Sequence, residues 1–294
     1  MNRFKLLLSE DRICTAMRIL FLPVIITCLS CQQKQIIKSP AGYQLNKPVK
    51  YLMPESLQEI SGIAFHQGKA DTLYAEEDED GRLYYFHPGD KQINYAKFGK
   101  KGDYEDVAIC REQAIMLRSD GVLFTFPFAE IRSEIKKTQK WENLLPDGEY
   151  EGLYADEKTG LLYVLCKHCV GEHTSESNTG YIFKMTKDGS IIKSGEFSLN
   201  VENIASMAGE KKMSFHPSGL AKNQLTNQWY ILSSVNKVLV VADAGWKVQS
   251  VFPLDPALFR QPEGIVFDRQ NNLYISNEGD KLSPGNVFRF NYKK

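Results

Sequence analysis

Five polar residues recur at equivalent positions along the chain, and three of them are glutamates. Each opens a short phrase in which it precedes a glycine or an aspartate and then an apolar strand. The five residues are Ser61, Glu105, Glu151, Ser218 and Glu263. If the phrases converge in space, like charges gather at one place and repel unless a cation lies between them. Calcium is favoured because it takes about six to eight oxygen ligands in irregular cages.

Ion pairing is the alternative interpretation of these glutamates. Arg118 and Lys167 follow the second apolar segments of the second and third phrases, where the other phrases have Glu77, Ser234 and Glu278. A ring with charges of both signs neutralises itself, and buried ion pairs are weak evidence for function. We predict a metal site at Glu105, Glu151 and Glu263. The polar residues expected around it are Ser61, Ser218, Glu77, Arg118, Lys167, Ser234 and Glu278.

The remaining acidic and histidine residues give weaker signals. Residues 76–80 are all acidic, but they lack the ligand order of an EF-hand loop, although Glu77 and Asp78 could contribute to the same site. The sequence has no Gly-x-Ser-x-Gly elbow, and its histidines lie in unrelated contexts. His216, before a Pro-Ser-Gly turn, is the one histidine that could face the site. We therefore assign no catalytic residue.

Cys166 and Cys169 form a short pair with His173 nearby. A second pair at zinc-site spacing is absent from the sequence, so structural zinc is not indicated. In an oxidising compartment a local disulfide is favoured, with two free thiols as the alternative. Cys110, inside an apolar segment, is expected to be buried.

The phrases recur with the period of propeller blades. Their second residues, Gly62, Asp106, Gly152, Gly219 and Gly264, are separated by 44, 46, 67 and 45 residues. Each phrase continues into a polar turn, a Leu-Tyr-like strand and a third apolar strand. A period of roughly 40–50 residues without long amphipathic helices is typical of four-stranded blades.

We predict an all-β protein with five blades, in which the polar residues opening the phrases lie at one mouth of the central channel. Only the 67-residue step departs from the period, and residues 166–178 (a polar loop) and 201–212 (a short helix) are expected to account for it. A sixth blade stays open as an alternative, because residues 49–52 could add an edge strand. The aromatic side chains are expected to fill the core between blades.

The N-terminal residues resemble a secretion signal. Met17-Arg18 precedes an apolar run that is too short to span a bilayer but suits a signal-peptide core, and Met17 is the expected true start. Cys28-Leu29-Ser30-Cys31 resembles a lipoprotein signal, which predicts a lipid on Cys31; ordinary cleavage nearby is the alternative. We divide the chain into a signal segment (1–31), a polar tether (32–50) and a propeller domain (51–294).

Composition excludes some classes of partner. The formal net charge is zero, and no basic stretch is interleaved with aromatic residues, so nucleic acid is not an expected partner. With 43% hydrophobic and 24% charged residues, the chain has an ordinary globular composition. The expected partners are a membrane through Cys31 and a small ligand or envelope protein, and we expect a monomer.

Several phrases together resemble the SdiA-regulated, or YjiK-like, family. They are Ile60-Ser-Gly-Ile, Gly102-Asp-Tyr-Glu-Asp-Val, Tyr150-Glu-Gly-Leu, His216-Pro-Ser-Gly-Leu-Ala, Ile231-Leu-Ser-Ser and Gln261-Pro-Glu-Gly-Ile. The resemblance spans roughly residues 52–292. It implies a five-bladed propeller, distantly similar to NHL-repeat and TolB-like propellers, on an envelope-anchored protein that binds calcium. It implies no biochemical activity.

Two functions follow from these observations. The first is a non-catalytic, calcium-binding propeller, anchored by lipid in the bacterial envelope, that presents its channel mouth to a ligand or protein. The second is a calcium-dependent hydrolase of an ester, lactone or phosphoester, supported by fold analogy alone. Because Gln-Gln-Lys-Gln after Cys31 contains no acidic sorting signal, we expect the protein to face the periplasm.

Overall fold

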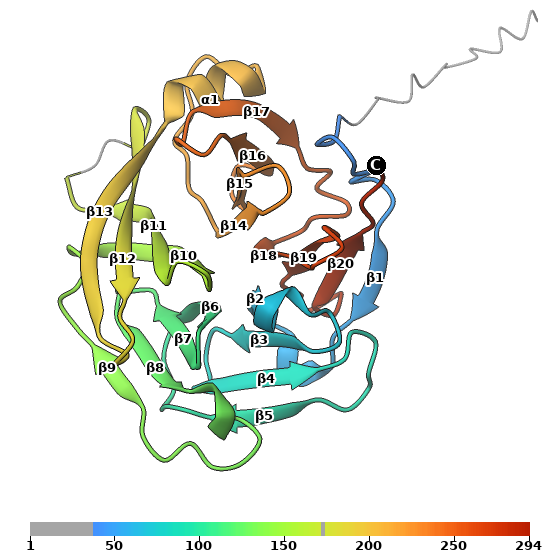
Figure 1. Cartoon of the computed structure of the whole chain (residues 1–294). Helices are drawn as coiled ribbons and strands as arrows, with labels where there is room; N and C mark the ends of the chain where they lie inside the picture. Colours follow the sequence, from blue (N-terminus) through green and yellow to red (C-terminus); the bar gives the residue numbers. More distant parts are fainter. Residues whose placement is uncertain (1–37, 172–173) are drawn as a thin grey trace, which may run out of the picture. The chain divides into compact units, whose positions relative to one another are not determined.

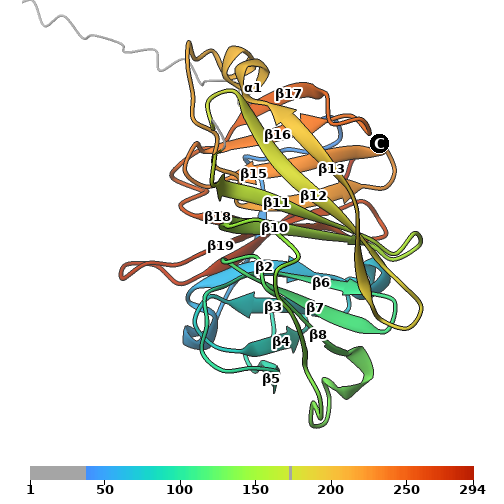
Figure 2. The ribbon, with the colours of Figure 1, turned by 90° about the vertical axis from the view of Figure 1, so that its left-hand side faces the viewer.

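The protein is a five-bladed β-propeller. The computed structural model describes residues 38–171 and 174–294, and within them five four-stranded antiparallel sheets stand in a ring (Figure 1). Figure 2 shows the ring from the side, with the sheet containing β10 to β13 facing the viewer. The predicted fold class and the count of five blades are confirmed.

Each blade is an antiparallel meander whose first strand lies nearest the axis. Blade 1 contains β2 (Ile60–Ala64), β3 (Leu73–Glu77), β4 (Arg82–Phe86) and β5 (Asn94–Lys97). Blade 2 contains β6 (Tyr104–Cys110), β7 (Gln113–Arg118), β8 (Leu123–Pro127) and β9 (Gln139–Trp141). Blade 3 contains β10 (Gly148–Asp156), β11 (Leu161–Cys169), β12 (Ser177–Met185) and β13 (Ile191–Asn200). Blade 4 contains β14 (Gly219–Asn223), β15 (Gln228–Ser233), β16 (Val238–Ala242) and β17 (Val248–Pro253).

Blade 5 closes the ring with strands from both ends of the domain. It contains β18 (Pro262–Phe267), β19 (Leu273–Asn277), β20 (Asn286–Phe290) and, as its outer strand, β1 (Val49–Leu52). Val49 pairs with Arg289 and Leu52 pairs with Asn286. The segment that left a sixth blade open therefore completes the fifth blade, and the six-bladed alternative is wrong.

Part of the expected tether belongs to the propeller core. Tyr43 and Leu45 are buried, and the Tyr43 hydroxyl donates a 2.6 Å hydrogen bond to the carbonyl of Asn271. The predicted boundary at residue 50 is thus too late, because two isolated apolar residues in a polar stretch leave no periodic signal. The predicted signal segment, Met17 and Cys31 lie outside the described residues.

The helix α1 (Val201–Ala208) occupies the long third step, as expected. The Asn200 side chain caps its N-terminus by accepting from the Asn203 N–H, and Gly209 ends it with a positive φ of 82°. Residues 166–178 are only partly a loop, because β11 continues to Cys169 and β12 starts at Ser177. Within residues 38–171 and 174–294, no helix is long and apolar enough to cross a membrane.

Three short 3₁₀ turns complete the architecture: η1 (Glu55–Leu57), η2 (His66–Gly68) and η3 (Phe128–Glu130). Aromatic side chains fill the spaces between the blades, as predicted. Trp246, for example, stacks on Phe197 and Trp229 with ring centroids 3.5 and 4.1 Å apart. Such rings bury large areas and supply much of the energy that holds neighbouring blades together.

At Gly62, Gly219 and Gly264 the inner strands approach one another so closely that a side chain does not fit, whereas at Gly152 the nearest atoms to an added Cβ lie 3.2 Å away. A Cβ on Gly219 would lie 2.2 Å from the carbonyl oxygen of Glu263 in the next blade. A Cβ on Gly264 would lie 2.5 Å from the carbonyl oxygen of Ser61, across the closure of the ring. The glycine at these three positions is therefore required by the close approach of the neighbouring blade.

We predict that Gly219→Ala destabilises the fold by about 1–3 kcal/mol, the usual cost of overpacking, because the obstructing atom is backbone and cannot rotate away. Gly195→Ala on β13 is the matched control, since the nearest atom to its added Cβ lies 3.9 Å away. Urea denaturation measures both. Equal stability of the two variants would contradict the packing explanation.

Candidate functional site

β-Bulges position the polar residues that open the phrases. In blades 2 and 3 the pairing of the first and second strands shifts by one residue at Glu105 and Glu151. In blades 1 and 5 it shifts by one residue within residues 60–63 and 262–265, the stretches that contain Ser61 and Glu263. A bulge inserts one unpaired residue and turns its side chain away from the regular alternation of the strand. The bulges recur at the same end of four inner strands, so they gather these side chains at one mouth of the channel.

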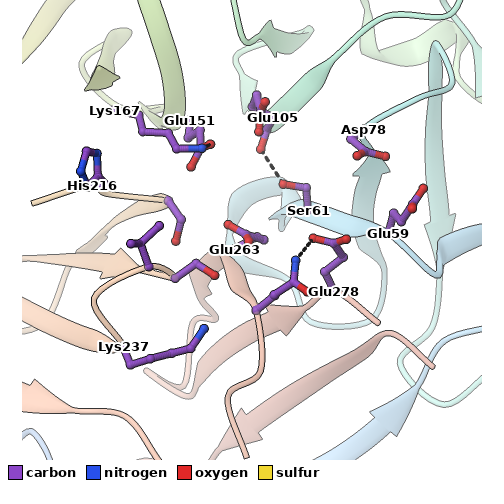
Figure 3. A pocket seen from close by; sticks show the side chains of 14 residues that line it. Glu59, Ser61, Asp78, Glu105, Glu151, Lys167, His216, Lys237, Glu263 and Glu278 are labelled. Carbon is purple, nitrogen blue, oxygen red and sulfur yellow. Dashed lines mark hydrogen bonds and ion pairs between the residues drawn. The ribbon is translucent and has the colours of Figure 1, made fainter. Parts of the chain in front are cut away.

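The side chains surround a cavity of about 440 Å³ (Figure 3). It is lined by polar and charged groups almost throughout: Glu59, Ser61, Asp78, Glu105, Glu151, Lys167, His216, Ser218, Ser234, Val235, Lys237, Gln261, Glu263 and Glu278. Eight of the ten residues predicted for the site are among them. We call this cavity the acidic mouth.

The other two predicted residues, Arg118 and Glu77, do not line the cavity. The Arg118 guanidinium binds the Asp120 carboxylate through two hydrogen bonds of 2.8 and 2.7 Å. Glu77 is buried, and its carboxylate accepts from the backbone N–H groups of Glu79 and Asp80. Turn residues close to each strand end thus satisfy both side chains locally.

Burial raises the pKa of the central glutamates. The pKa of Glu105 rises to about 9 and that of Glu263 to about 8, first through loss of hydration and next through repulsion from Glu151. Each carboxylate has too few positive partners to remain charged at neutral pH. The acidic mouth therefore has fewer positive side chains than its carboxylates would need to stay ionised.

Glu151 differs from these two because Lys167 forms an ion pair with it. Its pKa is raised by burial and held down by the Lys167 ammonium. The predicted alternative of paired charges thus describes Glu151, while Arg118 pairs elsewhere. Glu105, Glu151 and Glu263 share the cavity, but they do not form a group whose oxygens all lie within 4.8 Å of one another.

A tighter carboxylate group lies on the blade 1 side of the mouth. One oxygen each from Glu59, Glu77 and Asp78 lies within 4.8 Å of the others. Asp78 Oδ1 is buried with no hydrogen-bond partner, and burial and nearby Glu59 raise the Asp78 pKa to about 7. Glu77 and Asp78 were possible contributors from the sequence, whereas Glu59 was not predicted, because it precedes β2 and belongs to no phrase.

Below the mouth, buried polar side chains join the inner strands. Asp106 stands where the other blades have glycine, and its carboxylate accepts from the N–H groups of Val107 at 2.8 Å and of Leu153 in the next blade at 2.7 Å. Glu76 accepts from the Gly62 N–H at 2.6 Å. Burial raises the pKa of both carboxyls well above the usual range. In the sequence, the one indication of this role was that Asp106 takes the position that is glycine in the other four phrases.

Cys166 and Cys169 form a disulfide, the state that the sequence favoured, and Cys110 is buried. The disulfide lies on β11 on either side of Lys167, with both half-cystines buried in the core behind the acidic mouth. Among the described residues it removes two thiolates from the set of metal donors. The remaining donors at the mouth are carboxylates, hydroxyls and His216.

A second cavity, of about 1040 Å³, lies at the other ends of the inner strands. Its floor is apolar and includes Ile63, Val107, Leu153, Leu220 and Ile265. Polar groups at its rim bind one another: Gln67 receives a hydrogen bond from Arg269 and donates one to Glu157. Charged residues of both signs line this cavity, three acidic and four basic, whereas six carboxylates and two lysines line the acidic mouth. Of these two cavities, the acidic mouth is therefore the one with a clear excess of negative charge.

No protein-family model matches the chain, and no curated protein matches it. Among solved structures, a luciferin-regenerating enzyme has 10% identity and a TM-score of 0.54, covering 83% of this chain and 95% of its own. Glutaminyl cyclase from Myxococcus xanthus has 17% identity and a TM-score of 0.53, covering 84% and 98%. A glucose dehydrogenase has 11% identity and a TM-score of 0.50, covering 82% and 99%. At these identities the likeness shows the fold alone.

We predict that the protein, in a buffer with chelator and so without bound metal ions, loses stability as pH rises towards 9. The Glu105 and Glu263 pKa values are 4.5 in the reference state and about 9 and 8 when folded, so the folded protein binds more protons across this window. Unfolding then becomes more favourable with rising pH. Melting curves from pH 6 to pH 9 in chelator should show this decline, and the double variant Glu105→Gln, Glu263→Gln should flatten it.

Glu134→Gln is the control, because Glu134 is an exposed carboxylate outside the mouth. It should leave the pH dependence of the wild type unchanged. If the double variant and the wild type decline equally, the mouth carboxylates are not the cause.

Proposed function

We propose that the protein is a calcium-binding, non-catalytic propeller of the bacterial envelope whose acidic mouth receives a ligand or a protein partner. The observation that supports this proposal is that carboxylates outnumber lysines at that mouth. Six line the cavity: Glu59, Asp78, Glu105, Glu151, Glu263 and Glu278. Lys167 and Lys237 are the lysines that face them, and the Lys237 ammonium donates to the carbonyl of Arg260.

The donor set fits a bound cation. Crowded carboxylates either take up protons, as the raised pKa values indicate, or share a cation. Asp78 Oδ1 is a buried acceptor without a partner, and Glu59 and Glu77 offer oxygens beside it. These three residues would hold the ion, with Glu105, Glu151 and Glu263 adding negative charge or ligands around it.

Calcium is the cation that this set suits best. The donors are hard oxygens on several loops and strands, and calcium accepts irregular cages with water and backbone carbonyls. Magnesium demands a near-ideal octahedron, and zinc favours histidine and thiolate ligands. The resemblance to the SdiA-regulated family, which remains a prediction from the sequence, points to the same ion.

We predict that calcium raises the melting temperature of the mature protein. Binding to the folded state alone stabilises it by about 2.7 kcal/mol when free ion is 100 times the dissociation constant. Glu151→Gln should weaken binding and shrink the melting shift, because one carboxylate of the mouth is lost. Differential scanning fluorimetry with calcium and with chelator measures both effects.

Two comparisons make this test specific. Glu134→Gln, outside the mouth, should shift with calcium as the wild type does. Magnesium at the same concentration should give a smaller shift. An unchanged wild-type melt in calcium would remove the basis for the proposed function.

The envelope location rests on residues 28–31, which lie outside the described part of the chain. We propose that Cys31 carries the lipid and that the propeller faces the periplasm as a monomer. Changing Cys31 to Ala should move the protein from the membrane fraction to the soluble envelope fraction. Fractionation with immunoblotting checks this, and acyl mass on the wild type supplies the positive control. A membrane-bound Cys31→Ala protein, with no acyl mass on the wild type, would contradict the anchor.

A calcium-dependent hydrolase is the second candidate. The observation in its favour is that His216, a potential general base, lines the same cavity as the carboxylates. A screen of ester, lactone and phosphoester substrates, with calcium and with chelator, separates the two functions. A calcium-dependent rate that is lost in His216→Ala would favour the hydrolase, whereas no turnover supports the binding protein.

A further inference from the structure

Lys167 reaches the acidic mouth through a bulge that the other blades lack. Within β10 and β11, Glu149 pairs with His168 and Tyr150 pairs with Cys166, so Lys167 is the extra residue on β11. In the other four blades, the first and second strands show at most the one shift at the phrase position. The second bulge turns the Lys167 side chain towards the axis.

The disulfide closes this bulge. Cys166 and Cys169 bracket Lys167 and His168, and both half-cystines are buried against blade 3. Cys166 and Cys169 also pair across the hairpin with Tyr150 and Gly148. A short cross-link of this kind restricts the backbone conformations from which the lysine extends. The Lys167 backbone is thereby held beside the mouth.

The Lys167 ammonium contacts a residue that is itself turned inward by a bulge. Glu151 is the extra residue on β10, and Lys167 forms an ion pair with it. The Glu151 side chain is 11% exposed and that of Lys167 is 30% exposed, so the pair is partly shielded from water. Figure 3 shows the Lys167 ammonium beside Glu151 on the side of the cavity that faces Glu105.

Other cations near the mouth have different partners. Lys237 donates to the carbonyl of Arg260, and Arg118 binds Asp120. Among the described residues, Lys167 alone forms a salt bridge to a carboxylate that lines the cavity. The Lys167 ammonium neutralises a buried carboxylate, as a bound metal ion would do at the same place.

We propose that Lys167 is a tethered cation that competes with calcium for Glu151 and so sets the calcium affinity of the acidic mouth. This inference rests on the proposed function. A calcium ion that uses Glu151 must displace the ammonium, whose removal costs the ion pair and leaves two positive charges close together. The wild type should therefore have a lower calcium affinity than a variant that lacks the Lys167 charge.

Isothermal titration of calcium into the mature wild type and three variants tests the proposal. Lys167→Met keeps the length of the side chain without its charge and should bind calcium about tenfold more tightly, the scale of one partly buried ion pair. Lys167→Arg keeps the positive charge and should bind calcium with the affinity of the wild type. Lys237→Met removes an equal charge from the same cavity without breaking an ion pair, and its gain should be clearly smaller.

A melting experiment separates competition from a structural role. Without metal, Lys167→Met should melt below the wild type, because Glu151 is left buried and unpaired. With saturating calcium its stabilisation should exceed that of the wild type. A purely structural lysine predicts the same loss of stability with and without calcium, and that result would overturn the proposal.

The titrations also distinguish failure of the inference from failure of the proposed function. If the wild type binds calcium and Lys167→Met binds it equally or less tightly, the competition is refuted while the calcium site stands. If Lys237→Met gains as much as Lys167→Met, the effect is one of general charge, and the specific pairing is likewise refuted. If neither the wild type nor any variant binds calcium, the proposed function fails first.

Discussion

The close approach of the five inner strands is the constraint on which the rest of the structure depends. At Gly62, Gly219 and Gly264 the backbone of the next blade lies where a side chain would begin. Ring closure through β1 and β20 holds the blades at this distance. Because the residue before each glycine lies on the same narrow circle, the packing that closes the ring also crowds the side chains at one mouth.

The protein uses these crowded positions in two ways. Ser61 and Ser218 donate to carbonyl oxygens of the neighbouring inner strand, Glu105 at 3.0 Å and Pro262 at 2.7 Å, and so join the blades. The glutamates at the other three positions bring carboxyl groups into a partly dehydrated space. The serine hydroxyls, which donate to backbone carbonyls, hold neighbouring blades together. Carboxylates without a positive partner destabilise the compact state, and a cation that neutralises them is therefore bound favourably.

The asymmetry of the ring then decides which carboxylates already have a positive partner that a cation must displace. Blade 3 supplies its own ammonium through Lys167, so the charge at Glu151 is already balanced. Blade 1 supplies Glu77 and Asp78, with Glu59 beside them and no ion pair to these three residues in the described structure. A mouth built from five similar phrases thereby acquires one neutralised side and one acidic side.

The repeat, the strand order, the five blades and most residues of the mouth could be predicted from the sequence, because strand alternation and recurrent glycines are local signals with a fixed spacing. The sequence also placed Lys167 and Glu278 correctly at the cavity. Three features became known from the folded structure: Arg118 binds Asp120, Glu59 lies beside Asp78, and Tyr43 enters the core. The Arg118 contact is only two residues long, but the other two outcomes join residues 19 to 228 positions apart, as for Glu59 with Asp78 and Tyr43 with Asn271. Side-chain direction at a bulge and proximity across a closed ring are properties of the assembled blades, so no local pattern records them.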